Sequence, residues 1–338
     1  MPSELSPGDT APRWRTRLND FVTAVAWSPG GTFVAAASLS GEVIVLDADG
    51  NVVAKLPEHP LGALTLAWSP RTDRLAVGGQ DGVLRIWQPR AENVTLALDS
   101  WVTAVAWSPN GAWLGAGAGR DLFIVTPDGV AREVFPEQPS TITALAWGSN
   151  SRRVGIACYG GPRWFEPART TPQPARVFEW KGSLLTMAIA PSGKWLASGN
   201  QDHSVHVWRL WTGDDLEMSG YPTKVDAIAW DHRSRFLAVG GVGDVTVWDF
   251  AGRGPQGTRP RTLEGFAQKV NVVSFQRRGP LLAAGSADGL IALWDPARAT
   301  HAADVVALRA SVSAIDWSPD DRHVLAGTAD GDVAVVSW

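Results

Sequence analysis

One short segment, with the sequence Val-Thr-Ala-Val-Ala-Trp-Ser-Pro at Val22–Pro29, recurs along this chain and constrains its fold more than any other feature. The segment returns unchanged as Val102–Pro109 and, with conservative changes, as Ile142–Trp147. Five looser copies keep the same order of apolar and small residues. Each copy ends on a large apolar anchor residue: Trp27, Trp68, Trp107, Trp147, Ile189, Trp230, Phe275 and Trp317. Successive anchors lie 39 to 45 residues apart, which predicts eight related repeats.

Each repeat reads as four short strands separated by turn residues. In the first repeat the expected strands are Val22–Trp27, Phe33–Ser38, Glu42–Leu46 and Val52–Leu56. Short apolar runs punctuated by Gly, Pro, Asn and Asp are typical of all-β proteins. A period of about 40 to 45 residues is that of four-stranded propeller blades. We therefore predict an all-β, eight-bladed β-propeller made of four-stranded antiparallel blades.

The two ends of the chain predict how this propeller closes. The eighth repeat stops at Trp338 after its third strand, whereas Arg13–Leu18 forms an additional strand before the first anchor. If Arg13–Leu18 supplies the fourth strand of the last blade, the ring closes and no edge stays unpaired. We expect residues 1–11 to be disordered or loosely attached and residues 12–338 to form a single propeller domain.

Composition limits the location and the partners of the protein. The chain has 338 residues, a net charge of −4 and a single cysteine, Cys158. This charge is not that of a general nucleic-acid binder, for which a basic domain is expected, and one cysteine leaves no intrachain disulfide. We find no signal peptide and no apolar run long enough to span a membrane. We expect a cytoplasmic monomer that binds neither membrane nor nucleic acid. Arginine outnumbers lysine by 25 to 5, which favours a bacterial source.

The repeats resemble those of WD-repeat β-propellers. The resemblance extends from about residue 12 to residue 338 and rests on the Trp-Ser-Pro turns and on third strands that end in Trp or Trp-Asp. Four of these strand ends are Ile86–Trp87, Val207–Trp208, Val247–Asp249 and Leu293–Asp295. The resemblance implies a structural role for Trp87, Trp248, Asp249, Trp294 and Asp295.

The chain departs from the family pattern in its histidines. No Gly-His pair occurs, and only His59 occupies the place of the family's structural His, nine residues before the anchor. The resemblance implies that His59 bonds Asp81 in the turn that faces it. At this place the other repeats have Leu18, Leu98, Gln138, Trp180, Tyr221, Phe266 or Leu308, which indicates that apolar packing replaces the polar pair there. Seven blades are usual in the family, whereas eight anchors favour eight blades here.

Patterns for catalysis or metal binding are weak in this sequence. The chain has no Gly-x-Ser-x-Gly, His-Glu-x-x-His or phosphate-loop motif. His203 and His206 would point to opposite faces of a strand, and we interpret both as solvated. Asp47–Asn51 resembles the start of a calcium loop, but its Gly comes too early, so we interpret it as a turn. Cys158 is expected to be buried. We predict no catalytic residue, no cofactor and no metal; the alternative is a propeller enzyme or metal-binding protein that uses the central channel.

The remaining candidate is a binding surface. In WD-repeat propellers the residues before each innermost strand lie on the top face, around the channel mouth. By position these residues are Phe21, Gly62, Trp101, Thr141, Ser183, Lys224, Lys269 and Ser311. Exposed aromatic residues often anchor interfaces, Lys224 and Lys269 would form a small basic sector, and Arg120 and Tyr159 would join the same face. We therefore predict a non-catalytic scaffold that binds a protein or peptide through these six residues: Phe21, Trp101, Lys224, Lys269, Arg120 and Tyr159. The alternative for Phe21 and Trp101 is that they cover their own loops.

Two long turns stand out on the opposite face. They are Phe165–Ala175 and Phe250–Arg261, both rich in Pro and Gly, and the second carries three arginines. Such turns on a rigid scaffold often bind ligands, although solvated insertions are the favoured interpretation. The repeats are too diverged for simple consensus copying, and an engineered origin stays open.

Overall fold

The computed structural model describes residues 11–167 and 176–338, which form 31 β-strands and no helix. The chain divides into two compact units. The N-terminal unit is Leu18–Met187, and the C-terminal unit combines Ala188–Trp338 with the segment that ends at Arg17. Most of the segment 1–11 and residues 168–175 of the turn Phe165–Ala175 lie outside the described residues. Within the described residues no helix could span a membrane.

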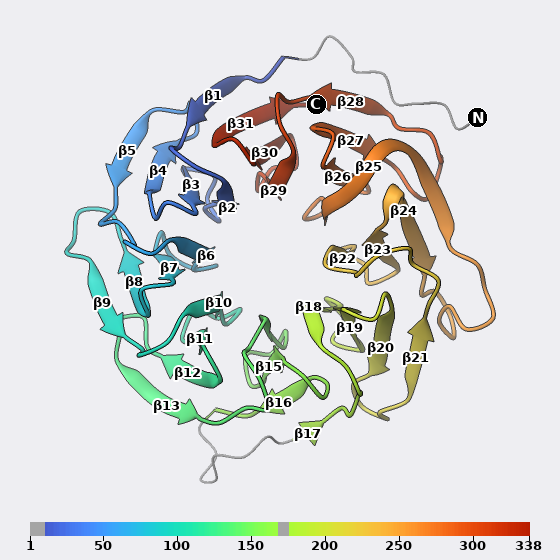
Figure 1. The fold of residues 1–338 in the computed structure, drawn as a ribbon, viewed down its shortest axis with the longest axis horizontal. Helices are drawn as coiled ribbons and strands as arrows, with labels where there is room; N and C mark the ends of the chain where they lie inside the picture. Colours follow the sequence, from blue (N-terminus) through green and yellow to red (C-terminus); the bar gives the residue numbers. More distant parts are fainter. Residues whose placement is uncertain (1–10, 168–175) are drawn as a thin grey trace. The chain divides into compact units, whose positions relative to one another are not determined.

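The N-terminal unit contains four antiparallel sheets of four strands, one for each of the first four repeats (Figure 1). Their strands are β2 (Val22–Trp27), β3 (Phe33–Ser38), β4 (Val43–Asp47) and β5 (Val52–Lys55); β6 (Ala63–Trp68), β7 (Leu75–Gly79), β8 (Val83–Trp87) and β9 (Val94–Ala97); β10 (Val102–Trp107), β11 (Leu114–Ala118), β12 (Asp121–Val125) and β13 (Ala131–Phe135); and β14 (Ala144–Trp147), β15 (Val154–Ala157), β16 (Arg163–Phe165) and β17 (Arg176–Val177). Each strand pairs with its neighbours in sequence. In Figure 1 the strands β2, β6 and β10 lie on the inner side of this unit and β5, β9 and β13 on its outer side.

The C-terminal unit contains the other sheets, the first of which begins with residues at the end of the N-terminal unit. Their strands are β18 (Leu184–Ile189), β19 (Trp195–Asn200), β20 (Val205–Arg209) and β21 (Asp215–Met218); β22 (Ile228–Trp230), β23 (Phe236–Gly240), β24 (Val242–Asp249), β25 (Arg261–Phe275), β26 (Leu282–Ser286), β27 (Leu290–Trp294) and β28 (Asp304–Ala307); and β29 (Val312–Trp317), β30 (His323–Thr328) and β31 (Asp332–Ser337). The strand β1 (Trp14–Arg17) pairs antiparallel with β31, with Trp14 opposite Val335 and Arg17 opposite Asp332. Residues Trp14–Arg17 of the predicted segment Arg13–Leu18 therefore form the fourth strand in the sheet of the eighth repeat.

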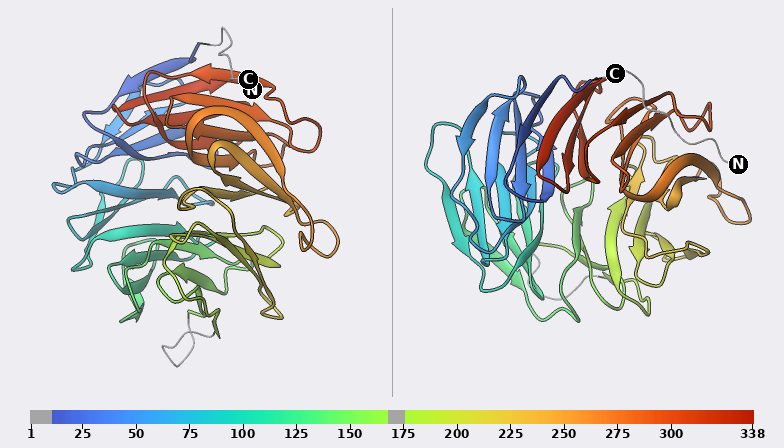
Figure 2. Two further views of the ribbon diagram at one scale, coloured as in Figure 1. Left: turned by 45° about the vertical axis from the view of Figure 1, so that its right-hand side comes forward. Right: turned by 45° about the horizontal axis from the view of Figure 1, so that its top comes forward.

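The sixth and seventh repeats differ from the predicted separate blades. Their strands form one seven-stranded sheet, β22 to β28, because β25 is a single strand of 15 residues that bends along its length (Figure 2). Its first half pairs with β24 and its second half with β26. Lys269 pairs with Val242 of β24, so the ladder of the sixth repeat continues up to the first strand of the seventh and no turn separates them.

Small residues let consecutive sheets pack face to face. The second strands β7, β11 and β26 are buried throughout and rich in Ala and Gly. A Cβ added to Gly78 would lie within 2.4 Å of Cγ1 of Val102, and one added to Gly285 would lie as close to Cγ1 of Val312. The glycines therefore provide the space that the first strand of the following sheet fills.

Five of the anchor tryptophans link their repeat to the one before it. In five repeats the indole N–H donates a hydrogen bond to a backbone carbonyl of the preceding repeat: Trp68 to Ala26 (3.1 Å), Trp107 to Ala67 (3.1 Å), Trp147 to Ala106 (2.9 Å), Trp230 to Ala188 (3.2 Å) and Trp317 to Ser274 (3.0 Å). A buried indole thus fills the core with its ring and satisfies its one polar atom.

In four repeats a second link runs forward from the start of the first strand. Thr23, Thr103 and Thr143 donate their hydroxyls to the carbonyls of Ala63, Ile142 and Leu184 at 2.8, 2.6 and 2.8 Å. Asn271 occupies the corresponding place in the seventh repeat and donates its amide to the carbonyl of Val312 at 3.0 Å. Together with the indole hydrogen bonds, these contacts connect three pairs of first strands at both ends: those of repeats one and two, three and four, and seven and eight.

Candidate partner-binding surfaces

The aromatic residues predicted to bind a partner lie at one end of the sheets of the N-terminal unit. Phe21 and Trp101 directly precede β2 and β10, and Tyr159 follows β15. Trp101 is 55% exposed and Tyr159 48% exposed. Phe21 is 38% exposed and is thus the more covered of the two residues that precede first strands.

Two leucines that the sequence prediction missed extend this surface. Leu39, in the turn after β3, donates its N–H to the carbonyl of Phe21 at 2.8 Å, and it is exposed. Leu61 precedes β6 and is 63% exposed. The next residue, Gly62, has a φ of 117°, and its missing side chain allows it to approach the Leu39 carbonyl. We call Phe21, Leu39, Leu61, Trp101 and Tyr159 the apolar edge.

Backbone hydrogen bonds hold the apolar edge in place. Gly119 donates its N–H to the Trp101 carbonyl at 3.0 Å, and Tyr159 donates its N–H to the hydroxyl of Ser140 at 2.8 Å. The neighbouring Arg120 is exposed and donates its Nε to the Gln138 carbonyl at 2.5 Å. These side chains therefore project from turns whose backbone is already ordered.

Lys224 and Lys269, the predicted basic sector, belong to the C-terminal unit. The structure brings them together around Asp226, which lies 2.7 and 2.6 Å from Nζ of Lys269 and 3.9 Å from Nζ of Lys224. The prediction missed Asp226, which occupies the place of Thr23 in its repeat. Its carboxylate offsets one of the two positive charges, so one net positive charge remains in this sector: Lys269 is the closer ion-pair partner, and Lys224 is the more exposed of the two lysines.

The contact implied for His59 is present and includes a third residue. Nδ1 of His59 lies 2.7 Å from Oδ1 of Asp81, whose Oδ2 accepts a hydrogen bond from Arg85 at 3.0 Å. Burial lowers the pKa of His59 more than the Asp81 carboxylate raises it. Burial alone would raise the pKa of Asp81, but hydrogen bonds from His59 and Arg85 outweigh it, and the pKa is lowered. Asp81 therefore stays ionised between a neutral imidazole and a guanidinium.

Trp248 corrects the expectation that apolar packing replaces this polar pair in the other repeats. Its indole N–H donates to the hydroxyl of Tyr221 at 3.0 Å, and that hydroxyl lies 3.1 Å from Oγ1 of Thr246. Tyr221 thus makes a side-chain hydrogen bond at the place where His59 makes one in its own repeat.

The other two predicted structural tryptophans lie in apolar cores. Trp87 packs edge-on against Trp68, and Trp294 packs edge-on against Phe266.

His206 corrects another prediction, because it is 1% exposed and not solvated. Its Nε2 lies 2.6 Å from Oδ2 of Asp215, and its ring stacks on Trp208 with centroids 4.3 Å apart.

The other residues considered for chemistry have structural surroundings. Cys158 is buried, and Asp47 holds a turn by accepting hydrogen bonds from Asn51. Among the described residues no three His, Cys, Asp or Glu side chains are close enough to hold a metal.

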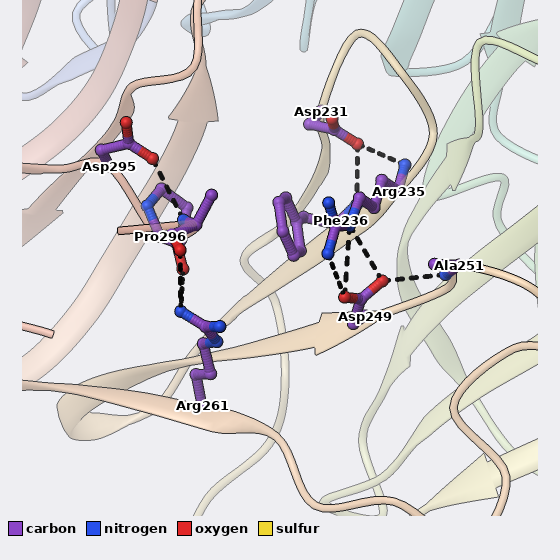
Figure 3. Close-up of polar contacts among 9 residues, drawn as sticks. Asp231, Arg235, Phe236, Asp249, Ala251, Arg261, Asp295 and Pro296 are labelled. Atoms are coloured by element: carbon purple, nitrogen blue, oxygen red, sulfur yellow. Dashed lines mark hydrogen bonds and ion pairs between the residues drawn. The ribbon is translucent and has the colours of Figure 1, made fainter. Parts of the chain in front are cut away.

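The aspartates of the two Trp-Asp pairs order turns of the C-terminal unit (Figure 3). Asp249 accepts hydrogen bonds from the guanidinium of Arg235 at 2.8 and 3.2 Å and from the N–H of Ala251 at 2.8 Å. Asp295 accepts from the N–H of Ala297 at 3.1 Å. Arg261, from the long turn Phe250–Arg261, donates to the carbonyl of Pro296 at 2.8 Å. The end of the long turn is therefore attached to the turn that follows β27 in the next repeat.

Two hollows flank Arg233 and Arg235 on these turns. A hollow of 310 Å³ also contains Arg278, Arg298, Asp231 and Asp295. A groove of 720 Å³ on the other side is lined by the turns that follow β18, β20, β22 and β24. The sequence analysis predicted neither hollow, although Arg233 and Arg235, close together in the turn between β22 and β23, could have indicated a positively charged surface.

Comparisons with known proteins agree with the repeat pattern. The family model "WD domain, G-beta repeat" (WD40) matches residues 15–47, 50–88, 94–124, 173–209, 257–295 and 305–336, together more than half of the chain. The repeats anchored on Trp147 and Trp230 lie outside these segments. Those two repeats contain the shortest strands, β16, β17 and β22.

Three curated relatives are similar over part of their length. The WD repeat-containing protein AAC3 of Dictyostelium discoideum is 26% identical over 56% of this chain and 46% of its own. Cell division cycle 20.1, cofactor of APC complex, of Arabidopsis thaliana is 24% identical over 58% and 44%. Eukaryotic translation initiation factor 3 subunit I of Emericella nidulans is 26% identical over 60% and 58%. The chain thus spans about half the length of these relatives, all of them eukaryotic.

Among solved structures, the computationally designed Ika8 protein superposes with a TM-score of 0.80. The match covers 95% of this chain and 98% of that one at 21% sequence identity, and it therefore shows the fold alone. Together with the antiparallel four-stranded sheets, it supports a β-propeller.

Proposed function

The chain belongs to the WD40-repeat family, and from this premise we propose that it is a non-catalytic scaffold that binds a segment of another protein through the apolar edge of its N-terminal unit. The observation that carries the proposal is Trp101, which is 55% exposed although the backbone around it is ordered. Rigid, exposed aromatic side chains are the typical anchors of protein interfaces.

Four further side chains support the proposal. Phe21, Leu39, Leu61 and Tyr159 are exposed at the same end of the sheets as Trp101. Covering apolar surface of this kind releases about 25 cal/mol per Å², and a protein segment offers the apolar side chains to do so. Two of the relatives are named as a cofactor of one complex and a subunit of another, which is consistent with an interaction role.

We also propose that the eight repeats form eight blades of one propeller closed by β1, and that the protein is a cytoplasmic monomer that binds no nucleic acid. The β1–β31 ladder and the succession of sheets within each unit support the closure. An experimental structure with seven blades, or a dimer mass in light scattering, would contradict these proposals. A bacterial source also stays a prediction.

A display library of random peptides tests the function. Peptides enriched on the wild-type protein should carry apolar residues, and Trp101→Ala should weaken their binding by at least about tenfold. Val52→Ala, an exposed apolar residue of β5 outside the apolar edge, is the matched control and should bind as the wild type does. If Trp101→Ala binds the peptides as tightly as the wild type, the apolar edge is not the binding surface.

Elemental analysis and a panel of hydrolase and dehydrogenase substrates test the non-catalytic assignment, which a stoichiometric metal or turnover would overturn.

A further inference from the structure

The groove of 720 Å³ in the C-terminal unit combines positive charge with an exposed aromatic ring. Lys194, Arg209, Arg233 and Arg235 line it, and no carboxylate does. Such a concentration of one sign is notable in a chain whose net charge is −4. We call this the cationic groove.

Two of the four cations have no carboxylate partner. Arg235 is held by Asp249, and Arg209 lies 3.9 Å from the exposed Asp214. Within residues 11–167 and 176–338, by contrast, neither Lys194 nor Arg233 forms an ion pair, and both are exposed. Their charges are therefore available to an anionic ligand.

The aromatic component is Trp211, which is 67% exposed at the rim of the groove. It lies in a tight turn, in which Gly213 donates its N–H to the carbonyl of Arg209 at 2.8 Å. Leu210 donates its N–H to the carbonyl of Lys194 at 2.9 Å, which attaches this turn to the neighbouring one. Trp211 is thus presented on an ordered backbone beside Lys194.

The other walls of the groove are also ordered before any ligand binds. The N–H of Ser192 donates to the hydroxyl of Ser234 at 2.8 Å, which links the turn of Lys194 to that of Arg233. Trp195 and Phe250 form a buried floor, with their rings 5.3 Å apart. A ligand therefore meets a preformed groove and loses little affinity to ordering it.

We propose that the cationic groove binds an acidic segment of a partner protein, with carboxylates at Lys194 and Arg233 and an apolar side chain on Trp211. Guanidinium groups bind carboxylates in a two-pronged geometry, and a tryptophan face accepts an apolar or aromatic side chain. The 310 Å³ hollow beyond Arg233 and Arg235 contains Arg278 and Arg298 but also Asp231 and Asp295, and Asp295 lies 3.4 Å from Arg298, so the unpaired positive charge is centred on the cationic groove.

A single-stranded nucleic acid fits this groove less well. Such ligands stack successive bases on several aromatic side chains, whereas only Trp211 is exposed here, because Trp195 and Phe250 are buried. The proposal goes beyond the function assigned to the apolar edge, since the two surfaces share no residue. An experiment that contradicts binding at the cationic groove therefore does not contradict binding at the apolar edge, and the reverse also holds.

Fluorescence anisotropy with three probes tests the proposal. The probes are a peptide with four glutamates around a central phenylalanine, the same peptide with glutamines, and an oligothymidine of equal charge. The acidic peptide should bind at least about tenfold more tightly than the other two, and more weakly as salt rises. Equal binding of the glutamate and glutamine peptides would overturn the proposal, as would tighter binding of the oligothymidine.

Variants place the binding in the groove. Lys194→Gln combined with Arg233→Gln, and separately Trp211→Ala, should each weaken binding of the acidic peptide about tenfold, whereas Lys55→Gln in the exposed strand β5 should change it less than about twofold. Lys194→Glu with Arg233→Glu should instead favour a peptide with four lysines. Unchanged binding of the acidic peptide by the Gln and Glu variants would show that the groove is not the site.

Discussion

Nζ of Lys269 lies 2.7 and 2.6 Å from the two carboxylate oxygens of Asp226, a residue 43 positions earlier in the chain. Asp226 occupies the place where Thr23, Thr103 and Thr143 donate to a carbonyl of the following repeat. An ion pair therefore replaces a neutral hydrogen bond as the link between these two repeats.

This pair should stabilise the protein modestly. The side chains are 26% and 31% exposed, so solvent screens their attraction. We expect a coupling free energy of about 0.5–1 kcal/mol in a double-mutant cycle of Asp226→Ala and Lys269→Met, and a smaller one at high salt. In the Lys269→Met background, Asp226→Thr should be more stable than Asp226→Ala, because a hydroxyl can restore the neutral link. Urea unfolding measures all of these, and a zero coupling energy would contradict the structural role.

Trp147 should stabilise the protein through both its ring and its N–H. Trp147→Phe keeps most of the apolar contact but loses the hydrogen bond to Ala106, and we expect a loss of about 1 kcal/mol in the free energy of unfolding. Trp147→Ala also leaves a cavity and should cost about 3–5 kcal/mol. Denaturant titrations of both variants check the order. Equal stability of wild type and Trp147→Phe would mean that the hydrogen bond contributes nothing.

Gly78 should not tolerate a side chain unless Val102 becomes smaller. Its added Cβ would lie 2.4 Å from Cγ1 of Val102, and we expect Gly78→Ala to cost about 1–3 kcal/mol. The preceding pair of repeats has Ala37 and Ala63 at the matching places, both buried in one core. Gly78→Ala combined with Val102→Ala should therefore be more stable than the two single effects predict. Thermal unfolding of the three variants measures this, and strict additivity would show that the two positions are independent.

The free energy of unfolding should decrease as the pH is lowered and His206 becomes protonated. Burial lowers the pKa of His206 more than Asp215, Glu217 and Asp202 raise it. The unfolded chain therefore binds a proton at a higher pH than the folded chain, and stability is lost as pH falls below about 6.5. His59 and His323 shift in the same direction, so the effect is shared.

His206→Thr should reduce this loss of stability. Thr246 shows that threonine is accepted at the matching place in the next repeat. The difference in Tm between pH 7.5 and pH 5.5 should be smaller in His206→Thr than in the wild type. The exposed His203 provides the control, His203→Asn, which should keep the wild-type difference. An unchanged pH dependence in His206→Thr would contradict the assignment.

The repeat pattern predicted the local elements well. The expected strands Val22–Trp27 and Phe33–Ser38 are those observed as β2 and β3, and the last two strands of that repeat differ by one residue. These strands depend on short-range patterns of apolar, small and turn residues, which the sequence displays directly. The contact between His59 and Asp81 was instead implied by the resemblance to WD-repeat propellers, and it is present.

Related four-stranded antiparallel units with aromatic anchors are predictable from the residues alone, because strand alternation and turn chemistry act over only a few residues. Three other features become visible only in the folded chain: β25 continues through two repeats, Asp226 pairs with Lys269, and His206 is buried against Trp208. The same holds for the groove in which the turns of Lys194, Trp211 and Arg233 meet. The reason is physical: each of these depends on how the side chains of one repeat meet those of the next, some 40 residues away, and no pattern within a single repeat records that packing.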